Sequence, residues 1–185
     1  MKTFITSDLH FGHKSIKKFC PITRSKYDDD TDRMNEAMIV EWNEIVAQED
    51  TVYILGDVAF MSGSDAARIM NRLNGTKILV EGNHDRKTLL DVNFRNAFSE
   101  IHKYLEIVHN GTFVVMCHYP IYDHNGAGRG SIMLHGHRHG NPYDLPGRIK
   151  DVGMDSTGKI VVSLDDVIRD LEKIPHMYHH DPRPV

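Results

Sequence analysis

Five short clusters of polar residues in this sequence carry side chains that bind divalent metal ions. Each contains aspartate, asparagine or histidine, whose oxygen and nitrogen atoms suit ions such as manganese, iron and zinc. Each also lies at or just after the end of an apolar run. One such cluster alone is usually a turn or a cap, but five in this order favour a single metal site assembled from the whole chain. The clusters are Asp8-Leu9-His10, Gly56-Asp57, Gly82-Asn83-His84-Asp85, Cys117-His118 and Gly136-His137-Arg138-His139.

The apolar runs before the clusters predict the strands that position them. They are short and rich in β-branched residues, which is typical of buried strands. Open α/β sheets gather their ligand sites in the loops beyond the carboxyl ends of the strands. The polar clusters are therefore expected at one edge of the sheet structure. The runs span residues 3–6, 51–55, 76–80, 112–116 and 131–134.

The spacing of apolar residues elsewhere predicts helices around these strands. One helix is expected to begin with Thr31 as its N-cap, a second to open at Ser64, and a terminal helix to follow an S-x-x-D motif at Ser163. Asn110-Gly111 predicts a hairpin turn. Early strands alternate with helices and later strands connect by hairpins and short loops. The expected fold is therefore α/β, with two mixed β-sheets packed face to face and flanked by helices.

Length and composition narrow the class of protein. A chain of 185 residues fits one domain, which we place at residues 1–174, with residues 175–185 as a C-terminal tail. The net charge of −4 argues against a protein that coats nucleic acid with a basic face, so no extended nucleic-acid surface is expected. Two cysteines are too few for a secreted disulfide framework. No apolar stretch approaches the ~20 residues that span a bilayer, and no signal peptide opens the sequence. We expect a cytoplasmic protein with no membrane partner.

The ordered set D-x-H, G-D, G-N-H-D, a later histidine and G-H-x-H resembles the calcineurin-like metallophosphoesterases. The resemblance covers the chain from Thr3 to about Leu171. Residues 151–155 and 162–167 further resemble the closing segment of the small bacterial and phage members, many of which carry asparagine where this chain has Asp151. The family's fold is a four-layer sandwich of two mixed sheets and flanking helices, which agrees with the fold expected from the strand and helix patterns.

The resemblance implies two divalent metal ions that share the carboxylate of Asp57. It places Asp8, His10, Asp57 and His139 on the first ion. It places Asp57, Asn83, His118 and His137 on the second. Mixed histidine and carboxylate ligation suits several metals, of which manganese is the first expectation and iron, zinc, cobalt and nickel are alternatives.

The resemblance also implies hydrolysis of a phosphoric ester by a hydroxide that bridges the two ions. His84 is expected to assist the leaving group as a general acid, and Asp85 to hold its imidazole in the required tautomer. Four weaker candidates for contact with the substrate are also open to ordinary surface roles. They are His13, Arg24, Arg86 and Arg138.

We expect the substrate to be a small phosphodiester, nucleotide-like in character, because 185 residues leave little room for a cap domain or a broad docking surface. A phosphomonoesterase or protein phosphatase using the same site is the main alternative. A non-catalytic metal-binding scaffold and a single-metal or metal-storage protein are weaker alternatives, since every expected ligand and His84 are present. The sequence leaves the metal, the physiological substrate and the oligomeric state open.

Overall fold

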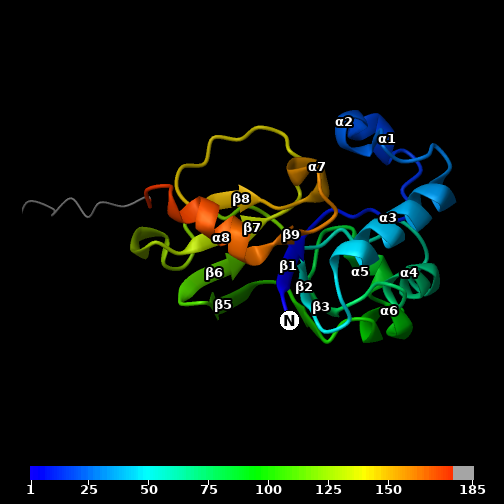
Figure 1. Ribbon diagram of the computed structural model, residues 1–185, viewed down its shortest axis with the longest axis horizontal. Coiled ribbons are helices and arrows are strands. Elements are labelled where there is room, and N and C mark those ends of the chain that lie inside the picture. Colours follow the sequence, from blue (N-terminus) through cyan, green and yellow to red (C-terminus); the bar gives the residue numbers. More distant parts are fainter. Residues whose placement is uncertain (177–185) are drawn as a thin grey trace, which may run out of the picture.

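The computed structural model describes residues 1–176 and contains two mixed β-sheets (Figure 1). The first sheet consists of β1 (Thr3–Thr6), β2 (Thr51–Ile54), β3 (Thr76–Val80), β4 (Glu100–His102) and β9 (Val162–Ser163). Its strand order is β4-β3-β2-β1-β9. Strands β1 to β4 are parallel, and β9 pairs antiparallel with β1. The carboxyl ends of β1, β2 and β3 therefore lie at the same edge of the sheet.

The second sheet has four strands in sequence order. They are β5 (Leu105–His109), β6 (Thr112–Met116), β7 (Ile132–His135) and β8 (Ile149–Asp151). Strands β5 and β6 form the expected hairpin, in which Asn110 and Gly111 adopt φ angles of 49° and 86°. Positive φ at both central residues is the requirement of a tight hairpin turn. Strands β6, β7 and β8 are parallel, so clusters after β6 and β7 also share one edge.

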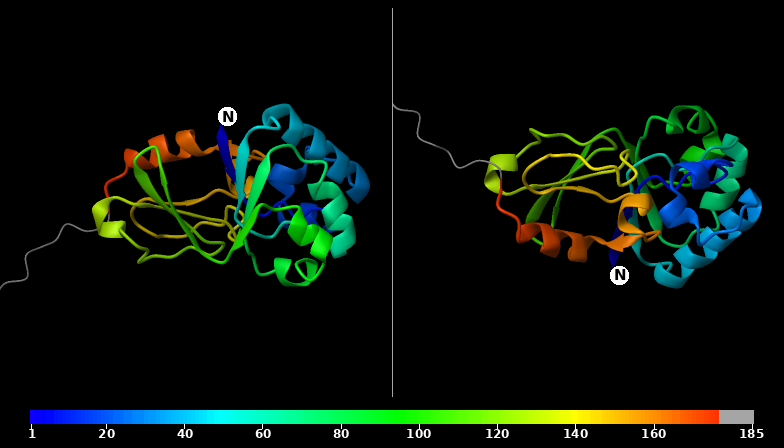
Figure 2. Two further views of the ribbon diagram at one scale, coloured as in Figure 1. Left: turned by 90° about the horizontal axis from the view of Figure 1, so that it is seen from below. Right: turned by 90° about the horizontal axis from the view of Figure 1, so that it is seen from above.

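Helices cover the first sheet on the face that is turned away from the second sheet, as the two views of Figure 2 show. The larger helices there are α3 (Thr31–Ile45) and α4 (Gly63–Met70), with α6 (Val92–Asn96) beside α4. Helix α8 (Leu164–Glu172) packs on the side of the second sheet. The short elements are α1 (Ile16–Phe19), α2 (Pro21–Arg24), α5 (Asp85–Thr88), the 3-10 helix η1 (Ala127–Arg129) and α7 (Met154–Thr157). The predicted α/β fold with two mixed sheets and flanking helices is confirmed.

Two of the expected helix starts are shifted by one or two residues. Asp30, rather than Thr31, is the N-cap of α3, because its carboxylate accepts hydrogen bonds from two backbone amides of the first turn. Ser62, rather than Ser64, caps α4, because its hydroxyl accepts a hydrogen bond from the backbone amide of Asp65. Ser163 caps α8 as predicted. The shifts arise because several residues at each start carry a capping side chain, and only the backbone geometry selects one.

The central strands are buried on both faces. Phe4 of β1 belongs to an apolar cluster that also contains fully buried Trp42 of α3 and Met70 of α4. Ile5, the next residue, belongs to the cluster that joins the first sheet to the second sheet and α8. This alternation follows from the two-residue repeat of a strand. Because close packing on both faces restrains β1 and β2, the loops at their carboxyl ends start from a rigid base.

The described chain continues four residues beyond α8. The predicted boundary between domain and tail falls within those four residues and stays a prediction. Most of the predicted tail, residues 177–185, lies outside the described residues. Within residues 1–176, none of the helices combines the length and apolar character that a membrane crossing requires.

Candidate metal centre

The loops after β1 and β2 continue the parallel pairing of these strands beyond their ends. The backbone N–H of Asp8 donates to the carbonyl of Gly56 at 3.0 Å, and that of His10 donates to the carbonyl of Asp57 at 3.0 Å. Phe11 donates to Val58 at the same distance. These bonds hold Asp8, His10 and Asp57 on two loops that lie side by side.

Five of the predicted ligands have left-handed backbone conformations, which L-residues with side chains rarely adopt. Such a conformation costs roughly 1–2 kcal/mol per residue and persists only where the surrounding structure imposes it. Within residues 1–176, the other non-glycine residue with positive φ is Asn110 of the hairpin. A concentration of strained residues of this kind is typical of functional sites. The five φ angles are 56° for Asp8, 50° for His10, 54° for Asp57, 70° for His137 and 49° for His139.

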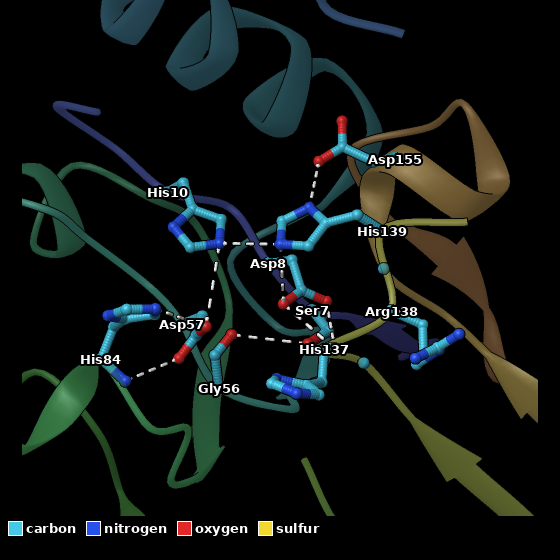
Figure 3. Close-up of polar contacts among 12 residues, drawn as sticks. Ser7, Asp8, His10, Gly56, Asp57, His84, His137, Arg138, His139 and Asp155 are labelled. Atoms are coloured by element: carbon cyan, nitrogen blue, oxygen red, sulfur yellow. Dashed lines mark hydrogen bonds and ion pairs between the residues drawn. The ribbon is translucent and has the colours of Figure 1, made fainter. Parts of the chain in front are cut away.

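A first group of possible metal ligands consists of Asp8, His10 and His139, whose ligand atoms all lie within 4.8 Å of one another. The Nε2 atoms of His10 and His139 are 3.3 Å apart, and the His139 Nε2 is 3.8 Å from the Asp8 carboxylate (Figure 3). The first polar cluster of the sequence, residues 8–10, thus lies against the last one, residues 136–139. Asp8, His10 and His139 all belong to the set that the family resemblance assigns to the first ion.

A second group consists of Asp57, His118 and His137, with ligand atoms again within 4.8 Å of one another. The His118 Nδ1 lies 2.7 Å from the carbonyl oxygen of Leu55 and so donates to it. The Nε2 of His118 lies 3.5 Å from the Asp57 Oδ2 and 3.0 Å from the Asn83 Oδ1. An imidazole nitrogen, a carboxylate oxygen and an amide oxygen that converge in this way are atom types that bind divalent cations.

Asp57 lies between the two groups. Its Oδ2 is 3.8 Å from the His10 Nε2, 3.5 Å from the His118 Nε2 and 3.9 Å from the Nε2 of His84. The side chain is 2% exposed, so water does not screen its charge. A buried carboxylate with ring nitrogens of both groups around one oxygen has the position that a shared ligand requires.

Burial disfavours charge on the side chains of the first group. It raises the pKa of Asp8 to about 7 and, with the neighbouring cations, lowers the pKa of His10 to about 2. The His10 Nδ1 is buried and has no hydrogen-bond partner among the described residues. Burial also works against the charged form of His139, but hydrogen bonds to Asp155 and Cys20 and the charge of Asp8 raise its pKa to about 10. The raised pKa means that His139 holds a proton in the absence of metal. A bound divalent cation would replace this proton, since metal binding requires deprotonated ligands.

Glycines allow the clusters to approach one another closely. A Cβ atom at Gly136 would collide with Ser7 and Asp8, and one at Gly82 would collide with Asp57. Glycine is therefore required at the first position of both the G-H-x-H and the G-N-H-D cluster, because a larger residue there would clash with a carboxylate on another loop. The close approach, the strained backbone and the converging donor atoms together fit the binding of divalent metal ions.

His84 lies at the open side of the cluster. Its side chain is 44% exposed, while its backbone N–H donates to the Asp57 Oδ1 at 2.9 Å. The ring lies 5.9 Å from the ring of His10 and 4.9 Å from that of Phe60, measured between centroids. The backbone is thus tied to the centre, and the partly exposed imidazole has its Nε2 3.9 Å from the Asp57 Oδ2 (Figure 3), which suits contact with a substrate held there.

The expected role of Asp85 is wrong. Its carboxylate accepts hydrogen bonds from the backbone amides of Asp57 and Val58 at 2.9 Å and of Gly82 at 2.8 Å. The residue is fully buried, and none of the contacts described for its carboxylate involves the imidazole of His84. Asp85 holds two loops together instead of orienting the neighbouring histidine.

Arg24 also differs from expectation, because it is fully buried and lies behind the cluster. Its Nε and Nη2 donate to the Asp155 carboxylate at 2.6 and 2.9 Å. Nη2 also donates to the backbone carbonyl of Asp8 at 2.7 Å, and Nη1 to that of Leu9 at 3.0 Å. With these partners the guanidinium supports the D-x-H loop and is not accessible to a substrate.

Asp155 is a site residue that sequence reasoning missed. Its Oδ2 lies 2.9 Å from the Nδ1 of His139, and its Oδ1 accepts from the hydroxyl of Thr23 at 2.7 Å. The bond to Nδ1 directs the Nε2 of His139 toward Asp8 and His10 (Figure 3). The signal in the sequence is the closing segment at residues 151–155, which contains Asp155 and resembles the small bacterial and phage members of the family.

The three other candidates for contact with the substrate take different positions relative to the ligand cluster. The half-buried ring of His13 lies 4.5 Å from that of Phe60 and 5.6 Å from that of His10, at the rim of the site. Arg86 is exposed and lines the same cavity as His84. Arg138 points away from the cluster (Figure 3), with its guanidinium over the ring of Tyr143. The structure thus brings His13 and Arg86 to the rim but not Arg138.

Known proteins resemble this chain over most of its length. A family model described as calcineurin-like phosphoesterase matches residues 1–184. An uncharacterized protein of Methanocaldococcus jannaschii is 31% identical over 180 residues, which cover 93% of this chain and 92% of that protein. The gene 66 protein of Mycobacterium phage L5 is 28% identical over 201 residues, covering 89% and 91%. The crystal structure of a protein of unknown function from Aquifex aeolicus has the same fold, with a TM-score of 0.68, 23% identity and coverage of 91% and 98%.

Proposed function

The chain belongs to the calcineurin-like phosphoesterase family, and from this premise we propose that it is a phosphodiesterase that acts on small, nucleotide-like substrates with two divalent metal ions. Family membership makes it a metal-dependent hydrolase of phosphoric esters. The observation that carries the finer proposal is the position of Asp57, whose Oδ2 lies within 3.8 Å of ring nitrogens of both ligand groups.

We assign the ligands as the family resemblance implies, and the two groups of converging atoms support the assignment. When bound, two such ions lower the pKa of water and neutralise charge on the phosphate oxygens. Manganese is the first choice of metal, with iron, zinc, cobalt and nickel as alternatives. The first ion would be held by Asp8, His10, Asp57 and His139, and the second by Asp57, Asn83, His118 and His137.

His84 is the proposed proton donor to the leaving oxygen. Its ring is exposed on the open side of the cluster, and its Nε2 lies 3.9 Å from Asp57, next to the place where a phosphate would be held. The hydrogen bond from its backbone N–H to Asp57 holds the His84 backbone beside that carboxylate. Proton transfer by a positioned histidine is an ordinary contribution to ester hydrolysis.

The charges around the site favour a diester over a monoester. A phosphomonoester carries close to two negative charges at neutral pH, whereas a diester carries one. Of three arginines considered for phosphate contact, Arg24 is buried behind the cluster and Arg138 points away from it. Arg86 is the arginine of the three that remains available for contact with a phosphate, and both Arg86 and the neighbouring Lys87 are exposed. Since neither Arg24 nor Arg138 can contact the scissile phosphate, the site suits a scissile phosphate with the lower charge.

Hydrolysis of matched nitrophenyl esters by the manganese-reconstituted protein tests the proposal. We expect bis(p-nitrophenyl) phosphate to have a larger kcat/KM than p-nitrophenyl phosphate. The Asp57→Asn variant should lose activity on both. A large advantage for the monoester would instead support the phosphomonoesterase alternative. Metal binding without hydrolysis of either ester would support the non-catalytic scaffold.

A further inference from the structure

A cavity of about 440 Å³ is lined by Asn83, which is a proposed metal ligand, and by His84. Figure 3 shows His84 on the side of the ligand cluster opposite Asp155. The wall of the cavity includes two apolar side chains and two cationic ones. These are Phe60 and Met61, and Arg86 and Lys87. A molecule whose scissile phosphate reaches the metal centre would therefore extend into a space that has both apolar and positive surfaces.

Phe60 presents an exposed aromatic ring on a restrained backbone. The side chain is 46% exposed, and its ring lies 4.5 Å from that of His13 and 4.9 Å from that of His84. Its backbone N–H donates to the carbonyl of Phe11 at 2.7 Å, next to a β-bridge between Phe11 and Ala59. A rigid aromatic ring at the mouth of a polar site suits stacking with a planar ligand group.

Arg86 and Lys87 supply positive charge that the protein itself does not neutralise. Both are exposed residues of α5. Across residues 1–176, neither is among the residues that form ion pairs, and the residues lining the cavity include no aspartate or glutamate. Some exposed arginines elsewhere, such as Arg72 with Glu36, are paired with acids, whereas Arg86 and Lys87 stand next to each other at the wall of the cavity. Two adjacent unpaired cations at a phosphoesterase site suit a second anionic group of the substrate.

We propose that this cavity binds a nucleotide portion of the substrate, with the heterocyclic base against Phe60 and a non-scissile phosphate against Arg86 and Lys87. The substrate class is then a nucleotide with one phosphate at the metal centre and at least one further phosphate. This inference rests on the proposed function, because it names the group that lies next to His84 during hydrolysis. It assigns selectivity to three residues that bind no metal.

Calorimetric titration of the manganese-reconstituted protein with three ligands tests the proposal. Adenosine monophosphate should bind roughly 5- to 150-fold more tightly than ribose 5-phosphate, which is the range expected for one stacked base. Adenosine diphosphate should bind up to about fivefold more tightly than the monophosphate at low salt, since exposed charge pairs contribute modestly. The second difference should shrink as salt is added.

Matched variants test which residues cause the two expected differences in affinity, the one conferred by the base and the one conferred by the second phosphate. Phe60→Ala should remove the advantage conferred by the base, whereas Leu90→Ala, which removes an exposed apolar side chain outside the cavity, should retain it. Arg86→Ala with Lys87→Ala should remove the advantage of the diphosphate, whereas Arg95→Ala on the exposed surface of α6 should retain it. Equal binding of adenosine monophosphate and ribose 5-phosphate to the unmodified protein, or a base advantage that persists in Phe60→Ala, would overturn the proposal.

The test of the nucleotide cavity can fail independently of the test of the phosphodiesterase assignment. Failure to hydrolyse any diester would refute the phosphodiesterase assignment whatever the binding ratios are. Hydrolysis of bis(p-nitrophenyl) phosphate combined with equal affinity for ribose 5-phosphate and adenosine monophosphate would leave the phosphodiesterase assignment intact and refute the nucleotide cavity alone.

Discussion

The carboxylate of Asp85 accepts a hydrogen bond from the backbone N–H of Asp57, with 2.9 Å between its Oδ2 and the amide nitrogen. The same oxygen accepts from Gly82 at 2.8 Å, and the Oδ1 accepts from Val58 at 2.9 Å. One buried side chain thus joins the loop after β2 to the loop after β3. This connection sets Asp57 beside Asn83, so the proposed shared ligand depends on a residue that contacts no metal.

Asp85→Asn is expected to destabilise the protein even without metal. The amide side chain retains one acceptor oxygen and turns an NH₂ group toward backbone donors, which leaves at least one buried N–H unpaired. The expected loss is roughly 1–3 kcal/mol in the free energy of unfolding, measured by urea denaturation in the presence of a chelator. An unfolding midpoint equal to that of the unmodified protein would contradict the role given to Asp85.

Asp57→Asn should disturb both metal sites, whereas Asp8→Asn should disturb one. The unmodified protein is expected to bind two equivalents of manganese per chain, because the Asp57 Oδ2 faces the histidines of both groups. Elemental analysis after reconstitution and desalting gives the stoichiometry. Two retained equivalents in Asp57→Asn, or one equivalent at saturation in the unmodified protein, would show that the carboxylate is not shared.

Asp155→Asn should weaken one metal site selectively. Asp155 holds the Nδ1 of His139 at 2.9 Å and thereby directs the opposite nitrogen toward Asp8. Loss of such a supporting contact typically reduces metal affinity about 10- to 100-fold. Calorimetric titration should show this loss at one of two manganese sites.

Thr23→Val is the control for that titration, since it removes a hydrogen bond to Asp155 without removing the bond between Asp155 and His139. It should leave both affinities close to those of the unmodified protein. Equal weakening of both sites in Asp155→Asn would indicate a general structural effect instead of positioning of His139.

His84→Ala should separate metal binding from turnover. The histidine is exposed and is not in either ligand group, so the variant should retain the fold and two manganese equivalents. Its kcat on a dialkyl phosphate should fall about 10²- to 10⁴-fold, the usual range for general acid–base assistance. The loss should be smaller for bis(p-nitrophenyl) phosphate, because nitrophenolate needs less protonation.

His118→Ala provides the comparison, because His118 belongs to the second ligand group. This variant should lose activity together with metal. Loss of a manganese equivalent in His84→Ala, or unchanged turnover of a dialkyl phosphate, would show that His84 does not have the assigned role.

The sequence by itself determined the strands that precede the polar clusters and the α/β class with two mixed sheets, but not the short strands β4 and β8. These features depend on local patterns, namely apolar runs followed by polar clusters. Because parallel strands end at a shared edge, side chains that follow them meet there whatever the details of packing. The five polar clusters were identifiable on that basis, as was the hairpin at Asn110, where positive φ is needed, whereas the assignment of individual ligands came from the family resemblance and stays a prediction.

Only the tertiary structure decided which polar residues support the site and which face a substrate. Arg24 is buried because Asp155, 131 positions later in the chain, lies beside it and accepts its hydrogen bonds. Asp85 binds backbone amides instead of His84 because the loop after β2 places those amides against it. Burial and hydrogen-bond partners of a charged side chain are set by segments distant in sequence, so local patterns cannot specify them.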